Sequence, residues 1–259
     1  MDVDTFKAKM RGSPRTKELY AENVNRYLQW LKEKKKQVSQ ESAQDYIDHL
    51  IALQKADNTI AVAANAIRKY FKVMRRTLQL EAPGVSISDP KYLSMPDFYR
   101  MVDACQTPLE KALIVTLFDT GARIGEIMNL ELKDIDWQGG FVRVKRKGGR
   151  LEDVNISDKG MEALKEWLDS RKGKSNRVFG DRKYRDVREL LLGVAERAEV
   201  KKFTIHRIRH SRAVQMLAAE CTLHDVQQAL GHKSITTTAN IYGRLRPADL
   251  KRRLQKAKW

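Results

Sequence analysis

Four side chains in the last quarter of the chain combine the groups that a phosphoryl transfer needs. His206 and Arg209 lie three residues apart, and Tyr242 follows His232 by ten residues. The surrounding residues 201–259 include thirteen Lys and Arg against three Asp and Glu, a net charge of +10. A tyrosine hydroxyl among imidazoles and this much positive charge is suited to attack a phosphodiester rather than a carbonyl.

Local helix signals indicate how these side chains are positioned. Thr204 is typical of a helix N-cap, so the His206 and Arg209 pair should share one face near the start of a helix, where phosphate is attracted. Thr222 opens a second helix in a capping box, and a glycine at 231 ends it. His232 then falls just beyond that helix.

Arg123 should be held rigidly at the edge of a cleft. Thr107, Pro108 and Glu110 form a helix start, and the almost wholly apolar residues 112–118 predict a buried helix that ends in a glycine turn just before Arg123. Two guanidiniums could clamp the nonbridging oxygens and stabilise a pentacoordinate transition state. The tyrosine needs a base or nearby cations because its hydroxyl ordinarily titrates near pH 10, and either His206 or His232 could accept its proton.

A basic β-hairpin supplies further cations. From residue 135 to 156 the hydrophobic period changes to two, and glycine pairs divide this stretch into three short strands. The tip of the second hairpin, residues 145–150, has four cations in six residues, which suits contact with a groove or a phosphate backbone. A lysine there could protonate a leaving 5′ oxygen. The strands are expected around residues 135–138, 141–146 and 151–156.

Periodicity predicts two domains. Helices are expected over residues 14–34, over 40–53 and after the break at residues 57–58, whereas residues 1–12 show no clear pattern and are expected to form a loose arm. Later helices are expected near Ser94 and over residues 159–171 and 183–197, with a basic tail helix over 247–259. The predicted boundaries are a helical domain at 1–80, a Pro-, Gly- and Ser-containing linker at 81–91, and a second domain at 92–259.

Composition points to a polyanionic partner. The formal charge is +17 and the isoelectric point is near 9.8, which favours double-stranded DNA over the alternative of an anionic membrane surface. The sequence contains neither an apolar run of the roughly 18 to 20 residues that span a bilayer nor an apolar signal-peptide core at its N-terminus. Cys105 and Cys221 are isolated thiols without metal-ligand spacing. We therefore expect a cytoplasmic, nucleoid-associated protein.

Four segments resemble the signature boxes of the tyrosine recombinase (phage integrase) family, which includes the Xer recombinases. They are residues 120–126, 206–211, 230–232 and 241–242. The similarity extends from about Pro14 to the C-terminus, because the N-terminal helices look like the core-binding domain of that family. It implies an all-α, SAM-like N-terminal bundle and a mixed α+β, mainly helical catalytic domain with a small antiparallel three-stranded sheet.

The resemblance also implies roles for individual residues. Tyr242 would be the nucleophile, Lys147 the general acid with Lys145 as the alternative, and Glu126 a support for the site that performs no chemistry. His210 fits none of these roles and is assigned to structure. The implied catalytic set is Arg123, Lys147, His206, Arg209, His232 and Tyr242. The expected DNA contacts are Lys145, Arg146, Arg150 and Arg207.

In this family one DNA strand is cleaved to a 3′-phosphotyrosine, strands are exchanged through a four-way junction, and the ends are rejoined. Neither ATP nor a metal or other cofactor is implied. A dimer on each site and a tetramer in synapsis are expected, with the 247–259 tail either docking on a neighbouring protomer or packing on its own domain. The spacing from His232 to Tyr242 is one residue longer than is usual in Xer-like members, which predicts a slightly longer loop before the nucleophile.

Two alternative functions stay open at this point. A DNA-relaxing enzyme of the type IB topoisomerase kind would share this chemistry, although the helical N-terminal domain and the tail favour recombination. A noncatalytic DNA-binding protein could keep the same fold, but six candidate residues argue against it. The sequence does not specify the target site, the choice between integration, dimer resolution and inversion, or cis against trans delivery of Tyr242.

Overall fold

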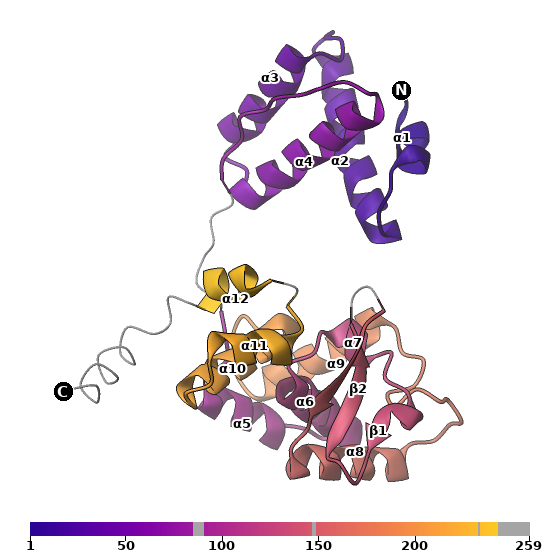
Figure 1. Ribbon diagram of the computed structural model, residues 1–259, viewed down its shortest axis with the longest axis vertical. Helices are drawn as coiled ribbons and strands as arrows, with labels where there is room; N and C mark the ends of the chain where they lie inside the picture. The colour runs from indigo at the N-terminus through magenta and orange to yellow at the C-terminus, as the bar shows by residue number, and fades with distance from the viewer. Residues whose placement is uncertain (85–90, 147–148, 233, 243–259) are drawn as a thin grey trace, which may run out of the picture. The chain divides into compact units, whose positions relative to one another are not determined.

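A computed structural model of the chain describes residues 1–84, 91–146, 149–232 and 234–242 (Figure 1). The chain forms two compact units, Met1–Ile87 and Ser88–Trp259. Lys147, the tail at 247–259 and much of the predicted linker at 81–91 lie outside the described residues. No helix in the described ranges is long and apolar enough to cross a membrane.

The N-terminal unit consists of helices packed around one apolar core. Apolar side chains recur along each helix at intervals of three and four residues, so each buries one face, and the most deeply buried include Val24, Tyr27, Ile47 and Ile67. The helices predicted over 14–34 and 40–53 are confirmed. The helices are α1 (Val3–Lys9), α2 (Pro14–Glu33), α3 (Gln40–Ala52) and α4 (Asp57–Val73).

The prediction of a loose arm at residues 1–12 is wrong, because this segment forms α1. Asp2 caps the helix by accepting the backbone N–H of Thr5 at 2.8 Å. Phe6 is fully buried and its ring meets that of Tyr70 edge-on, with centroids 5.4 Å apart. Met10 is 2% exposed in the same core. The helix is therefore stabilised by tertiary contacts that local periodicity does not reveal.

The C-terminal unit is mainly helical and contains one antiparallel sheet with the strand order β1-β2-β3 (Figure 1). This architecture confirms the predicted fold class. The sheet consists of β1 (Ile135–Asp136), β2 (Phe141–Lys145) and β3 (Leu151–Asn155), preceded by a 3-10 turn, η1 (Leu132–Asp134). The helices are α5 (Met95–Asp103), α6 (Pro108–Thr120), α7 (Ile124–Ile127), α8 (Asp158–Ser170), α9 (Tyr184–Arg197), α10 (Ile205–Ala218), α11 (Leu223–Leu230) and α12 (Ile235–Tyr242).

Helix α6 is the buried centre of this unit. Its capping box at Thr107 and Glu110 forms as predicted, and Leu113 and Ile114 are fully buried. The helix packs against α8, α9 and α10, so most of its surface is buried, which explains why most of its residues are apolar. This rigid helix carries the chain directly to Arg123.

A second, smaller apolar cluster joins α10, α11 and α12. Its fully buried members are Ala213, Val226, Leu230 and Tyr242, and Leu217 is 3% exposed. The segment before Tyr242, predicted as a loop, is helix α12. The tyrosine is therefore held at the end of a helix that packs on the rest of the domain.

Candidate active site

Arg209 lies at the centre of the candidate site and joins two helix ends. Its Nη1 donates to the carbonyl of Gly121 at 2.6 Å and its Nη2 to the carbonyl of Leu230 at 2.6 Å. Gly121 caps α6 and Leu230 is the last residue of α11, so one cation satisfies carbonyls at two helix C-termini. Burial, followed by the charge of Arg123, lowers the pKa of Arg209 to about 10, which leaves it protonated near neutral pH.

Arg123 is oriented by Glu126. The Arg123 backbone N–H donates to Glu126 Oε2 at 2.8 Å and its Nη1 donates to Oε1 at 2.9 Å. Burial alone would raise the pKa of Glu126, but the Arg123 N–H and the Arg146 guanidinium outweigh it, so the pKa falls below its ordinary value. The Arg123 side chain keeps 39% of its surface exposed and can still receive a ligand.

Two imidazoles lie in the electrostatic field of these arginines. Burial, then the charges of Arg209 and Arg123, lowers the pKa of His206, and the same causes lower the pKa of His232 to about 4. Both rings are therefore neutral near physiological pH and able to accept a proton. His206 is exposed, while His232 forms a hydrogen bond through Nδ1 with Thr238 Oγ1 at 2.9 Å. The structure thus brings Arg123, His206, Arg209 and His232 into one site.

Tyr242 contacts His210, for which the sequence predicts only a structural role. Its hydroxyl lies 2.5 Å from Nδ1 of His210, one helical turn after His206 on α10. Burial lowers the pKa of His210 to about 4, so its ring is neutral near physiological pH and its Nδ1 can accept the hydrogen bond of the phenol. Tyr242 is fully buried, and burial raises its pKa to about 12. The four-residue spacing of the two histidines could have identified His210, because residues four apart share a helix face.

The four predicted DNA contacts divide into two groups. Lys145 is exposed, and so is Arg150, although its guanidinium pairs with Glu152. Arg146, which was predicted to contact DNA, has a side chain that is 3% exposed, and all of its guanidinium nitrogens donate within the protein. Side chains alternate along a strand, and Arg146 continues the buried series of β2. Arg207 likewise donates to the carbonyls of Tyr92, Lys201 and Lys202.

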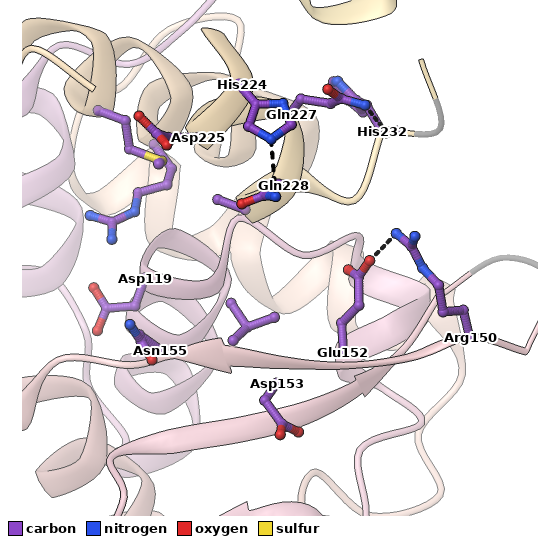
Figure 2. A pocket seen from close by; sticks show the side chains of 14 residues that line it. Asp119, Arg150, Glu152, Asp153, Asn155, His224, Asp225, Gln227, Gln228 and His232 are labelled. Atoms are coloured by element: carbon purple, nitrogen blue, oxygen red, sulfur yellow. Dashed lines mark hydrogen bonds and ion pairs between the residues drawn. The ribbon is translucent and has the colours of Figure 1, made fainter. Parts of the chain in front are cut away.

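A cavity of about 650 Å³ adjoins the site between β3 and α11 (Figure 2). Glu152 and Arg150 are paired on one side, and His224 and Gln228 form a hydrogen bond on the other. Its lining carries four carboxylates against two arginines, Arg150 and Arg212, so it is negative on balance and the positive site around Arg209 is the better place for a DNA backbone. The carboxylates are Asp119, Glu152, Asp153 and Asp225.

Two family models and several known proteins match the sequence of this chain. Residues 91–248 match the phage integrase family, and residues 4–80 match the phage integrase N-terminal SAM-like domain. Tyrosine recombinase XerA of Pyrococcus horikoshii is 27% identical over 232 residues, 84% of this chain and 81% of that protein. Tyrosine recombinase XerD of Halalkalibacterium halodurans is 27% identical over 256 residues, 87% of this chain and 86% of that protein.

Solved structures share the fold at low sequence identity. XerH recombinase bound to palindromic difH substrate in a post-cleavage complex gives a TM-score of 0.75 at 18% identity, covering 90% of this chain and 78% of that chain. The Tn1549 transposon integrase in complex with transposon right end DNA gives 0.72 at 17% identity, covering 97% and 99%.

Proposed function

The chain belongs to the phage integrase family, and from this premise we propose that it is a site-specific DNA recombinase that cleaves and rejoins strands through an ester on Tyr242. The observation that carries this proposal is that Arg209, three residues after His206 on α10, donates to the carbonyls of Gly121 and Leu230, which lie two residues before Arg123 and His232, while Tyr242 bonds His210 on the same helix. These groups come from separate parts of the chain. Structural cations are seldom concentrated in this way, because like charges repel.

The two arginines bind the nonbridging oxygens of the scissile phosphate. Glu126 holds Arg123 in a fixed orientation, and two helix-end carbonyls hold Arg209, so both guanidiniums are organised before DNA arrives. Removing one donor of this kind typically raises a barrier by about 3 to 4 kcal/mol. Either arginine variant should therefore lower the cleavage rate by about two to three orders of magnitude.

The nucleophile must leave its buried position before it reacts. With a pKa of about 12, Tyr242 exists as phenolate in about one molecule in 10⁵ near pH 7. A fully buried hydroxyl on His210 also has no route to a phosphodiester. Once α12 releases it, a neutral imidazole of His206 or His232 can take its proton while the phenolic oxygen forms the bond to phosphorus. A hairpin lysine, Lys147 by resemblance, supplies the proton for the departing 5′ oxygen.

Affinity for DNA comes chiefly from phosphate contacts. The net charge of +17 provides them, and each phosphate neutralised makes the affinity fall by about 0.9 log unit per log unit of salt. A dimer on each site and a tetramer in synapsis complete the proposal. Because strand exchange needs two cleaved sites held together, the assembled species should form only with paired duplexes.

The decisive experiment traps the covalent intermediate. A duplex with a nick beside the cleavage site loses the short 5′ fragment after cleavage, so the protein stays attached to the 3′ phosphate. We expect an adduct with the native chain and none with Tyr242→Phe, which keeps the ring but lacks the nucleophilic oxygen. Adduct formation by Tyr242→Phe would refute the assignment of the nucleophile, and no adduct with any native duplex would favour a noncatalytic DNA-binding protein.

A second measurement separates recombination from DNA relaxation. With two copies of the target duplex, a recombinase produces four-way junctions and exchanged products. A type IB relaxing enzyme instead removes supercoils from a single circle without exchanging strands. Relaxation without junctions would replace the recombinase proposal by this alternative.

A further inference from the structure

Arg146 connects three elements of the catalytic domain through one guanidinium. It follows Lys145, which pairs with Leu151 at the end of β2, and its own N–H donates to the Arg150 carbonyl at 2.7 Å. Its side chain is 3% exposed. The three nitrogens donate to Glu126 Oε2 of α7 at 2.7 Å, Glu152 Oε2 of β3 at 2.7 Å and the Ala229 carbonyl of α11 at 2.9 Å.

The contact with Glu126 reaches the first candidate arginine directly. Glu126 Oε2 accepts both the Arg123 backbone N–H and Arg146 Nη1, while its Oε1 accepts Arg123 Nη1. One carboxylate is therefore shared by two cations. Without Arg146, the carboxylate would neutralise Arg123 alone, which would turn that guanidinium away from a phosphate and weaken its charge.

The contact with α11 reaches His232. Gly231, the residue between α11 and His232, has φ +61°, and a Cβ at this position would lie 2.7 Å from Arg146 Nε. Only glycine combines this backbone conformation with so close an approach of the guanidinium. The backbone that leads into His232 therefore packs directly against the Arg146 side chain.

We propose that Arg146 is a positioning residue for strand cleavage, which fixes the hairpin, Arg123 and His232 relative to one another and does not bind DNA. This inference rests on the proposed recombinase function. It differs from the sequence expectation, in which Arg146 belonged to the DNA-contacting cations of the hairpin tip. A positioning role predicts slower cleavage at saturating DNA with unchanged affinity, whereas a DNA contact predicts weaker binding.

Single-turnover cleavage of the nicked duplex at increasing DNA concentration distinguishes them. We expect Arg146→Met to lower the rate at saturating DNA by about 10²-fold, the effect of a small misplacement of catalytic groups, with the half-saturating DNA concentration changed less than about threefold. The salt dependence of binding should stay that of the native chain. A DNA contact would instead reduce the salt slope by about 0.9 and raise the half-saturating concentration.

Arg143→Met is the matched control. Arg143 lies in β2, three residues before Arg146, is exposed, and pairs with Asp153 rather than with any residue of the site. Its saturating rate should stay within about twofold of native. If Arg146→Met does not fold, Arg146→Lys keeps the charge, but a single ammonium cannot reproduce the planar three-way fork, so the same rate loss is expected.

A double-mutant cycle with Glu126→Gln gives the final test. If Arg146 acts through Glu126, the double variant should be little slower than the slower single variant, whereas independent effects would multiply. A native saturating rate in Arg146→Met or Arg146→Lys would overturn the proposal, and multiplying effects would overturn the part of it that places Arg123 through Glu126. These comparisons require that the native chain forms the covalent adduct. If the native chain forms none, the recombinase proposal itself fails, and this result is distinct from a failure of the role proposed for Arg146.

Discussion

The hydrogen bond between His210 and Tyr242 should hold α12 against the domain, and removing its acceptor should loosen that helix. In His210→Phe the ring volume is largely kept, but the buried Tyr242 hydroxyl loses the only acceptor that the described residues give it. An unsatisfied buried hydroxyl costs about 1 to 3 kcal/mol. The population of molecules with α12 detached should therefore rise by about 5- to 150-fold.

Hydrogen exchange of the α12 amides measures this population. We expect their protection in His210→Phe to fall by about that factor, while α6 keeps its native protection. His206→Phe, one turn earlier and without a hydrogen bond to α12 among the described residues, serves as the control. In the double variant His210→Phe with Tyr242→Phe no hydroxyl is left unsatisfied, so protection should largely recover. Unchanged protection in His210→Phe, or no recovery in the double variant, would refute the reasoning.

Three other predictions follow from the same geometry. The pKa values of His210 and His232 are lowered to about 4 from an ordinary 6.5, so between these pH values the unfolded state binds more protons than the folded state. The free energy of unfolding should therefore fall as pH drops from about 6.5 to 4, by at most about 3 kcal/mol for His210. Urea titrations at several pH values would measure this change. Gly231→Ala should lower the melting temperature more than Gly149→Ala, because both have positive φ but only the first places Cβ against another side chain. Glu126→Gln should slow adduct formation by about tenfold or more without changing the salt slope of DNA binding, since Glu126 orients Arg123 and is itself 8% exposed. The first prediction is contradicted by equal stability at pH 6.5 and pH 4, the second by equal melting temperatures of the two glycine variants, and the third by a native cleavage rate in Glu126→Gln.

Local signals in the sequence were sufficient for much of the domain. The capping box at Thr222 and the αL cap at Gly231 are where they were expected, because both depend on residue types within a few positions. The period of two found the sheet, and the signature boxes led to a family that the comparisons confirm. Such features are encoded by short stretches and need no knowledge of distant partners.

The remaining features depend on tertiary contacts. The first helix forms because Phe6 meets Tyr70 across the core, which no pattern within residues 1–12 shows. The charged residues around Arg146 predict a surface cation, whereas the alternation of β2, extended by one residue, predicts the buried side chain that the structure has. The burial of Tyr242 reflects packing among three helices and is not encoded near the tyrosine itself.

The hydrogen bonds of Arg209 affect how its presence in distant relatives of this chain is interpreted. Its guanidinium donates to carbonyls at the ends of two helices, so the side chain proposed to bind a phosphate also stabilises the fold. A descendant that no longer cut DNA would still be stabilised by these two hydrogen bonds. Within the described ranges, the Arg123 side chain donates to Glu126 and joins no two helix ends, so the loss of the arginine at 123 would be the earlier sign of a protein that binds its target without cutting it.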